Sequence, residues 1–363
     1  MLVLCPFPQG VAAGQRLKYE QYFEDWRNAG YDIDVSSFMD HAMWRVAYEP
    51  GHFPAKFWGT VRGHLRRMRD LFRVHRYDVV YVFMWVTPFG TSVFERLTRR
   101  LAKALLFDVE DNILTEQAIP KDDNPNHLLR LLKGPGKARY LIRHADHVIT
   151  SSPFLNDFCL DINLHGRCTY VSSSVDADRF RPASDYNNDD VVTVGWTGTF
   201  SSKVYLDMLK GVFQELSRRV PFRLKVIGNF DYALDGVDLE VVRWTSEREV
   251  EDLQTFDIGV YPLPIDDWVL GKSGLKAIQY MMSGLPTVAT RVGTTPMIID
   301  HEVNGLLVEN DVEWLDALER LIRDPKLRER LGKAAREKAV ANYSTRAMAR
   351  VYQEVLTGLE GSR

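Results

Sequence analysis

The sequence predicts an α/β protein built from two doubly wound parallel-sheet domains. Short apolar runs of strand length alternate with segments of helical periodicity along the chain, which is the βαβ pattern of parallel sheets. The 363 residues exceed what one ordinary hydrophobic core holds. The alternation also restarts after a polar segment near the middle, which indicates two domains in tandem.

The expected strands are apolar and bounded by polar or turn-forming residues. In the first half they are Met1–Cys5, Asp32–Ser36, Val79–Phe83, Ala104–Asp108, His147–Thr150 and Cys168–Val171. In the second half they are Val191–Trp196, Phe222–Ile227, Leu239–Val242, Ile258–Tyr261, Thr287–Ala289 and Gly305–Val308. Helices are expected at Leu17–Ala29, Phe57–His75, Tyr205–Arg218, Glu247–Gln254 and Ser273–Ser283, and beyond Glu313.

The polar segment sets the expected domain boundaries. Residues 1–172 form the first domain and residues 191–342 the second, joined by a linker over 173–190 that carries Pro182. We expect a C-terminal helix over 343–363 to pack back on the first domain.

Composition and charge narrow the class of protein. The charged fraction of 26% and the hydrophobic fraction of 45% are ordinary for a globular chain. The net charge of −3 argues against a dedicated nucleic-acid binder, which needs a basic surface, so no nucleic acid is expected. Three widely spaced cysteines argue against a disulfide framework and favour a reducing, cytoplasmic location.

The segment from Asp257 to Asn310 is the most informative part of the chain. It predicts a strand, a lysine-bearing loop, a short helix closed by Gly284, a strand and a second glycine loop, which suits a phosphate-bearing ligand. Lys272 and Lys276 fall at the start of the predicted helix, where the backbone dipole repels cations. With Gln279 they are spaced i, i+4, i+7 and share one face.

A bound anion would compensate for the two lysines. The free amides of Gly271, Ser273, Gly274 and Leu275, together with an ammonium group, would form a diphosphate clamp. The alternative is a solvated lysine face on a surface helix.

A second loop of small residues, GWTGTFSSK over 195–203, follows an apolar strand. Small residues let the backbone approach a phosphate closely, and Lys203 adds positive charge. The candidate contacts in this loop are Gly198, Thr199, Ser201 and Ser202. The alternative is an ordinary turn.

Two features of the first half are candidate parts of a second substrate site. The loop PQGVAAGQR over 8–16 follows the first strand but lacks the G-x-G-x-x-G spacing of an ordinary dinucleotide fold. Asp108, Glu110 and Asp111 end an apolar strand, where α/β proteins place ligands, and alternation puts Asp108 and Glu110 on one face. They predict a carboxylate that orients an acceptor or assists its departing proton. The alternative is a helix cap with salt bridges.

A basic segment covers Lys56 to Arg76, with seven Lys or Arg and one acid, Asp70. A basic amphipathic helix over 56–76 that also carries Phe57 and Trp58 can lie on an anionic membrane surface. The alternative is a solvated face.

Three motifs in fixed order resemble the retaining glycosyltransferases of family 4, which have the GT-B fold. They are D-I-G-V-x-P-L over 257–263, G-K-x-x-x-K-x-x-Q-Y-M-x-x-G-L-P-x-V-A-x-x-V-G over 271–293, and N-G-L-L-V over 304–308. The tracts ADHVITSS (145–152), VSSSVDADRFRP (171–182) and VGWTGT (194–199) extend the resemblance. It implies two Rossmann-like domains facing across a cleft.

The resemblance also implies a function. A nucleoside diphosphate sugar, UDP- or GDP-linked, would bind the second domain, and a saccharide or lipid-linked saccharide acceptor would bind the first. Transfer would retain the anomeric configuration and need no obligatory metal or other cofactor. By this resemblance Lys272 and Lys203 stabilise the leaving diphosphate, and the glycine loop with Gly10, Gly14 and Arg16 faces the donor.

The chain departs from the family at three places. The family's Glu-x7-Glu pair falls on Gly271 and Gln279; Gln279 can still bond a ribose diol, and Asp266 or Asp267 is the candidate for the sugar hydroxyls. The family's Arg falls on Thr199, and its His-Asp pair on Glu110 and Asp111. These departures keep two rivals open, a non-catalytic nucleotide-sugar-binding scaffold and a GT-B epimerase.

Overall fold

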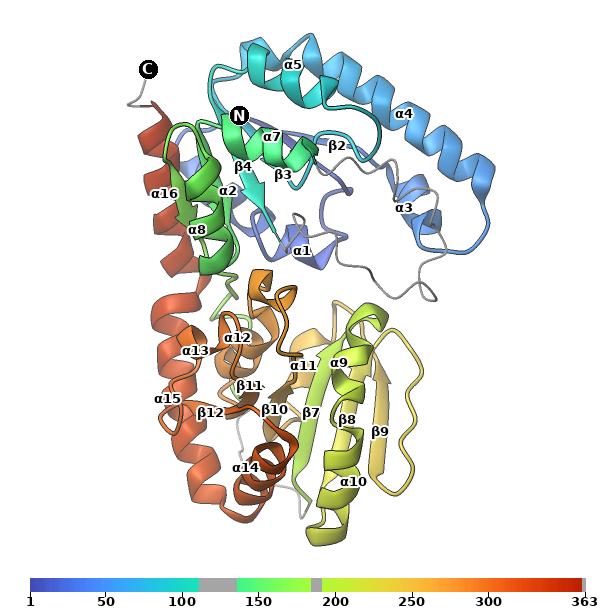
Figure 1. The fold of residues 1–363 in the computed structure, drawn as a ribbon, viewed down its shortest axis with the longest axis vertical. Coiled ribbons are helices and arrows are strands. Elements are labelled where there is room, and N and C mark those ends of the chain that lie inside the picture. The colour runs from blue at the N-terminus through green and yellow to red at the C-terminus, as the bar shows by residue number, and fades with distance from the viewer. Residues whose placement is uncertain (111–135, 184–190, 361–363) are drawn as a thin grey trace. The chain divides into compact units, whose positions relative to one another are not determined.

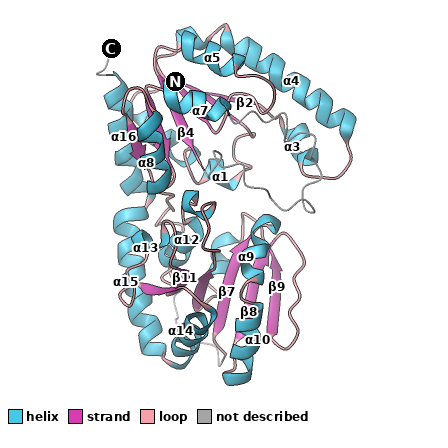
Figure 2. Ribbon diagram, viewed as in Figure 1, coloured by secondary structure: helices cyan, strands magenta, loops and turns pink. Residues whose placement is uncertain are grey.

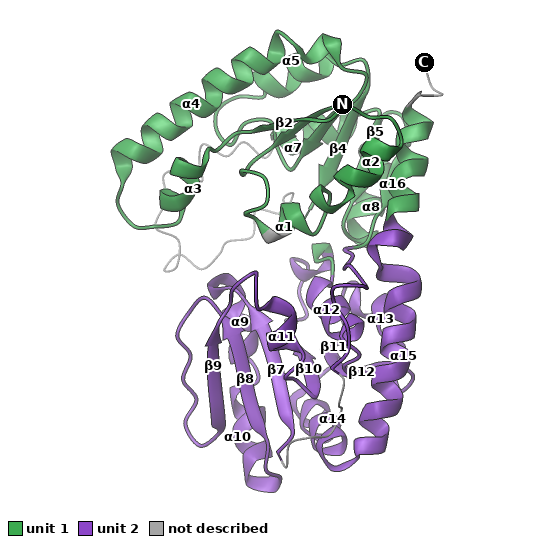
Figure 3. Ribbon diagram, turned by 180° about the vertical axis from the view of Figure 1, so that it is seen from behind, with its two compact units in different colours: residues 1–172, 271–273, 349–363 green, residues 173–270, 274–348 purple. Residues whose placement is uncertain are grey.

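The computed structural model describes residues 1–110, 136–183 and 191–360, which form two compact units (Figure 3). Unit 1 comprises residues 1–172, 271–273 and 349–363, and unit 2 comprises residues 173–270 and 274–348. Each unit is organised around one six-stranded sheet whose strand pairs are all parallel. The expected fold class, two doubly wound parallel sheets, is confirmed (Figure 2).

The sheet of unit 1 has the strand order β2-β1-β3-β4-β5-β6. Its strands are β1 (Leu2–Cys5), β2 (Asp34–Ser37), β3 (Val80–Phe83), β4 (Leu105–Val109), β5 (His147–Thr150) and β6 (Cys168–Tyr170). β1, β3 and β4 are buried at every position, as expected for central strands covered on both faces. All six lie within two residues of the ranges expected from the sequence.

The helices of unit 1 connect these strands. They are α1 (Ala13–Arg16), α2 (Phe23–Asn28), α3 (His41–Ala47), α4 (Phe53–Leu71), α5 (Val93–Leu101), α7 (Gly136–His144) and α8 (Pro153–Ile162), with 3-10 turns η1 (Glu20–Tyr22) and η2 (Val74–Arg76). The single helix expected over 17–29 is instead divided into η1 and α2, and α1 precedes this range. Lys18 lies in the break, buried, and donates to the carbonyl of Val171 (2.9 Å), a contact that sequence periodicity does not reveal.

The sheet of unit 2 has the order β12-β11-β10-β7-β8-β9. Its strands are β7 (Thr193–Gly198), β8 (Arg223–Gly228), β9 (Asp238–Arg243), β10 (Ile258–Tyr261), β11 (Thr287–Thr290) and β12 (Gly305–Val308). Its helices are α9 (Lys203–Asp207), α10 (Lys210–Arg219), α11 (Glu249–Leu253), α12 (Leu275–Met282), α13 (Thr295–Ile298), α14 (Asp311–Arg323) and α15 (Pro325–Tyr343), with η3 (Phe200–Ser202) and η4 (Val269–Gly271).

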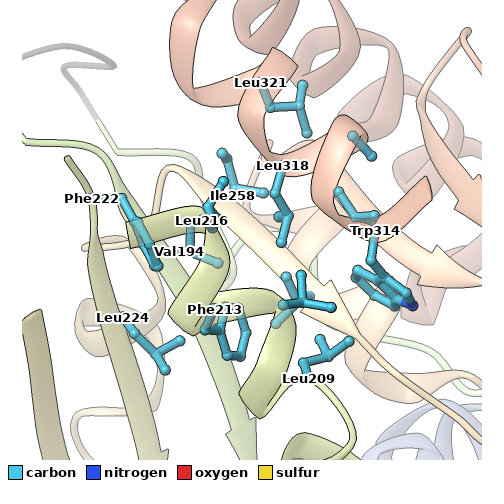
Figure 4. Close-up of a cluster of buried hydrophobic side chains, with 14 of the residues drawn as sticks. Val194, Leu209, Phe213, Leu216, Phe222, Leu224, Ile258, Trp314, Leu318 and Leu321 are labelled. Carbon is cyan, nitrogen blue, oxygen red and sulfur yellow. The ribbon is translucent and has the colours of Figure 1, made fainter. Parts of the chain in front are cut away.

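One core cluster of unit 2 joins the sheet to helices from distant parts of the sequence. Phe213 and Leu216 of α10 and Trp314 and Leu318 of α14 pack over Val194 of β7 (Figure 4). All five side chains are buried, and the removal of this apolar surface from water favours closure of the layer.

The segment expected as a linker is packed into unit 2 as far as it is described. Val175 and Phe180 are buried in a core cluster of that unit, and the backbone of Val175 bonds to Tyr343 and Thr345. The last helix, α16 (Thr345–Glu360), crosses from unit 2 to unit 1 in the division of the chain. Its Tyr352 is buried and its ring lies 4.8 Å from that of Tyr22.

Strand order fixes where each unit can bind a ligand. In unit 1 the chain passes from β1 outward to β2 and then returns to β3 on the other side of β1. In unit 2 it passes from β7 through β8 to β9 and then returns to β10. Open α/β sheets bind ligands at the carboxyl ends of the strands at such reversals. The loops after β1 and after β7 and β10 are therefore the candidate ligand-binding loops.

Candidate functional site

The loop after β7 is held in a tight turn by its own hydroxyl groups. Gly198 ends the strand, and a Cβ there would lie 2.3 Å from the Trp196 ring and 2.6 Å from the Ser202 hydroxyl. Thr199 and Ser202 form a reciprocal capping box, and the Thr199 hydroxyl is 2.9 Å from that of Ser201. The loop thus needs a glycine for close packing, and it leaves Thr199 and Ser201 exposed.

Lys203 begins α9 directly after this turn. Its ammonium group lies 3.4 Å from the Asp207 carboxylate one turn later and over the ring of Tyr232 at 5.8 Å. The side chain is 38% exposed, so the ion pair is in contact with solvent and weak. An anion at the β7 loop can therefore draw Lys203 from Asp207 at small cost.

The helix after β10 begins two residues later than the sequence suggests. α12 starts at Leu275, and Gly274 is its N-cap with φ of +75°. A Cβ on Gly274 would lie 2.2 Å from Cδ1 of Ile298, so glycine is required there for both conformation and space. The expectation that Lys272 and Ser273 belong to the helix is therefore wrong, because the left-handed turn at Gly274 separates them from it.

Lys276 lies in the first turn of α12 and connects it to the β7 loop. Its ammonium group donates to the Ser202 hydroxyl (3.2 Å) and lies over the buried ring of Trp196 at 5.2 Å. The amides of the first turn have no partner within a helix. The structure therefore brings a cation, a hydroxyl loop and a helix N-terminus together within unit 2, at the reversal of its sheet.

The spacing of Gln279 suggested a side chain exposed to a ligand, but the structure buries it. It is buried in the second turn of α12, and its amide donates to the carboxylate of Glu249 (3.3 Å) at the start of α11. Arg179 forms an ion pair with the same carboxylate at 3.1 Å. A carboxylate from α11 therefore lies beside the amide of Gln279 in α12.

The residues before α12 form a capped turn. Asp266 accepts from the amide of Val269 (3.1 Å), which caps η4, and both Asp266 and Asp267 are exposed. Gly271, Lys272 and Ser273 are grouped with unit 1, where the Ser151 hydroxyl donates to the Gly271 carbonyl at 3.4 Å. Lys272 is half-buried.

In unit 1 the loop after β1 meets a carboxylate from the end of β4. A Cβ on Gly14 would lie 3.0 Å from Oε2 of Glu110, so the carboxyl group rests against the glycine. Gly10 has φ of +79°, and its amide donates to Glu20 (2.8 Å). The half-buried Arg16 ends α1 in the same loop. Gly14 and Glu110 are therefore in contact, and Gly10 and Arg16 belong to the same loop as Gly14.

Asp108 lies in the interior instead of at the surface. Its side chain is fully buried, accepts a hydrogen bond from the Tyr81 hydroxyl and lies 3.9 Å from the ammonium of Lys18. Burial raises the pKa of this carboxyl group. Strand alternation paired it with Glu110, but the structure gives Asp108 a packing role. Asp111 lies outside the described residues.

Within the described ranges, no group of three or more His, Cys, Asp or Glu residues is arranged to hold a metal ion. Sequence reasoning also missed three residues near α12. Glu249 accepts from Gln279, Trp196 lies under the ammonium of Lys276, and Arg179 pairs with Glu249. Each comes from an element far away in the sequence. Only the apolar strand that carries Trp196 gave a signal, because it ends in the glycine turn.

The two doubly wound units define the class of fold to which this chain belongs. Two parallel sheets of this topology on one chain constitute the GT-B fold, and comparison with solved structures confirms it. Sucrose-phosphate synthase from Thermosynechococcus elongatus superposes with a TM-score of 0.74 at 17% identity over all of both chains. HepE from Anabaena in complex with UDP and glucose gives 0.70 at 15% identity over 99% of this chain and all of the other.

Sequence comparison confirms the resemblance to the family 4 glycosyltransferases. Residues 191–324 match the family described as glycosyl transferases group 1. A D-inositol 3-phosphate glycosyltransferase from Saccharomonospora viridis is 30% identical over 226 residues, which are 53% of this chain and 51% of that protein. The chain thus spans about half the length of the curated relative.

Proposed function

We propose that this protein transfers a sugar from a nucleoside diphosphate sugar to a hydroxyl acceptor, with retention of configuration. The observation that carries the proposal is the arrangement in unit 2 of Lys276, the hydroxyl loop 199–202 and the first turn of α12. Hydroxyl groups, an ammonium and the amides of a first helical turn match the oxygens of a diphosphate.

The chemistry follows from where charge develops. As the bond from the anomeric carbon to the diphosphate oxygen breaks, negative charge grows on the leaving group. Lys203, Lys272 and Lys276 with the α12 amides would stabilise that charge, at about 3 kcal/mol per well-placed donor. The acceptor oxygen bonds to the anomeric carbon, and its proton passes to the leaving phosphate, as the family resemblance implies. No protein nucleophile is needed.

The donor contacts would come from two loops, the loop after β7 and the loop that leads into α12. We propose that Gly198, Thr199, Ser201 and Ser202 approach the diphosphate with Gly271, Ser273, Gly274 and Leu275. Glu249 with Gln279 would bond the ribose, because this pair replaces the family's carboxylate. Asp266 or Asp267 would hold sugar hydroxyls. A UDP-sugar is the first donor to test because HepE was solved with UDP, and a GDP-sugar is the second.

The acceptor, a saccharide or lipid-linked saccharide, would bind unit 1. Glu110 beside Gly14 is the proposed orienting group, with Asp111 after it. A reducing cytoplasm is the proposed location, because Cys5, Cys159 and Cys168 are all unpaired. Contact with an anionic membrane is a separate proposal that depends on α4 and α5.

A non-catalytic binding protein is the second candidate, favoured by the loss of the family's carboxylate pair at Gly271 and Gln279. The test is turnover of a panel of UDP- and GDP-sugars, followed by mass spectrometry with and without lipid-linked saccharides. Transfer only in the presence of an acceptor supports the proposal. Turnover without acceptor indicates an epimerase, and nucleotide binding without any turnover indicates a scaffold.

The residue-level test is Lys272→Ala. We expect turnover to fall by about 10²–10³-fold, the usual effect of losing one charge-stabilising donor, with little change in the melting temperature. Lys326→Ala on the exposed start of α15 is the matched control and should leave turnover unchanged. Wild-type kinetics in the Lys272 variant would remove that lysine from the mechanism.

A further inference from the structure

Helix α4 buries its small and polar residues and exposes its apolar ones. Gly59, Gly63, Arg67 and Asp70 face the unit and are buried. A Cβ on Gly59 would lie 2.7 Å from Sδ of Met43, and one on Gly63 would lie 2.6 Å from the ring of Phe38, so the helix approaches its neighbours closely. Close contacts at these two glycines and the Arg67–Asp70 ion pair therefore hold the inward face of α4 against the unit.

The opposite face of α4 carries a continuous apolar stripe. Trp58, Leu65, Met68 and Phe72 follow one another at intervals of seven, three and four residues, which places them along one side of a helix. Their exposed fractions are 59%, 56%, 47% and 75%. Phe57 is 62% exposed beside Trp58. A surface helix normally turns such a stripe toward the core, so this one is available to a partner.

Helix α5 extends the apolar surface, because it lies beside α4 in unit 1 (Figure 1). Val93, Leu97 and Leu101 recur every four residues and are exposed. A hollow of about 420 Å³ between the helices is lined by Met68, Leu71, Phe72, His75, Leu97 and Leu101. Ten of the 23 exposed large hydrophobic residues in the described chain fall within residues 48–101. Apolar exposure is thus concentrated on one surface, where patches have functional meaning.

The charge on this surface is positive. Arg62 and Arg69, seven residues apart, flank the stripe of α4, Arg76 follows in η2, and Arg100 lies near the end of α5. The two acids of these helices face inward: Asp70 pairs with Arg67 (3.1 Å), and Glu95 lies 3.8 Å from the ammonium of Lys137. No ion pair within the described residues joins Arg69, Arg76 or Arg100 to an acid. These three arginines are therefore available to an anionic partner, whereas Arg62 is held by an ion pair with Asp40 (3.1 Å).

We propose that the α4–α5 surface, formed by residues 57–76 and 93–101, docks on an anionic phospholipid bilayer. Aromatic and aliphatic side chains would enter the boundary between headgroups and acyl chains, and the flanking arginines would contact lipid phosphates. A second copy of the chain fits the surface less well, because it would bring more arginines and no exposed carboxylate from these helices. Charge complementarity therefore selects the lipid surface.

The docking is peripheral. No helix in the described part of the chain is long and apolar enough to cross a bilayer. α4 has 19 residues, of which five are Lys or Arg, so it would lie in the plane of the membrane interface.

The experiment is co-sedimentation of the full chain with vesicles, without any sugar donor. Two kinds of vesicle are compared at low and high salt: phosphatidylcholine with about 30% phosphatidylglycerol, and phosphatidylcholine alone. We expect binding to the anionic vesicles that weakens as salt rises. Phe57→Ser/Phe72→Ser should abolish it. Arg69→Gln/Arg76→Gln should weaken it about 25-fold, at about fivefold per arginine.

Val312→Ser on α14 is the matched control, because Val312 is 68% exposed in unit 2 and should bind vesicles like the wild type. The substituted side chains are exposed, and circular dichroism checks that each variant is folded. Absence of binding to anionic vesicles, or unchanged binding in the Phe57/Phe72 variant, overturns the proposal. A wild-type dimer that the Phe57/Phe72 variant converts to a monomer in analytical ultracentrifugation, with no vesicle binding, assigns the surface to a second copy. None of these results bears on donor turnover, so docking and transfer fail or stand separately.

Discussion

Gly274 is a position where one added methyl group should disturb the proposed donor site. In Gly274→Ala the new Cβ would start 2.2 Å from Cδ1 of Ile298, whereas carbon atoms in contact lie about 3.5–4.0 Å apart. Ile298 is fully buried and has little room to move. The φ of +75° adds the strain of a left-handed residue. We expect a loss of about 3 kcal/mol in the stability of unit 2, the upper end for such sites.

That loss corresponds to a fall of about 6–12 °C in the melting temperature of a unit of this size. Urea denaturation followed by tryptophan fluorescence measures the free energy directly. Gly211→Ala on α10 is the matched control, because a Cβ there meets nothing within 4 Å and should stabilise the helix by about 0.5–1 kcal/mol. A Gly274→Ala protein as stable as the wild type would refute the claim that packing against Ile298 fixes the start of α12.

Two further predictions concern buried titrating groups. Gln279→Glu restores the family's carboxylate but places it against the carboxylate of Glu249 (3.3 Å), so the pKa of one of the two carboxyl groups should rise. The stability of the variant relative to wild type should then fall as pH increases from about 5 to 8. Melting temperatures across that range, with Gln353→Glu at an exposed position of α16 as control, test this; a constant difference contradicts it. Burial lowers the pKa of His147 from 6.5 to about 4, so wild-type stability should fall as pH drops from about 6.5 toward 4, by up to about 3 kcal/mol. His147→Gln can keep the hydrogen bond to Thr169 and should remove this loss of stability at acid pH. His165→Gln, at an exposed position, should not.

Local patterns predicted the strands well, because a strand buried on both faces leaves an apolar run in the sequence. His147–Thr150, Ile258–Tyr261 and Gly305–Val308 were predicted with the observed ends. Helix boundaries were less predictable. The periodicity around Ser273 continues upstream of the true start, and only the φ of +75° at Gly274 in the folded chain shows that the turn is left-handed. Gln279 and Asp108 illustrate the same limit, because their partners lie far away in the sequence.

The sequence by itself determined the class of this protein: the alternation of apolar runs and helices, and the order of lysine, glycine and proline from Gly271 to Gly293, are local properties of the chain. The tertiary structure decided which of the marked residues share a site. It joined Lys276 to Ser202 across 74 positions and Gln279 to Glu249 across 30, and it turned the apolar stripe of α4 outward. Such pairings depend on packing between distant elements, and no local periodicity encodes which face of a helix its neighbours will cover.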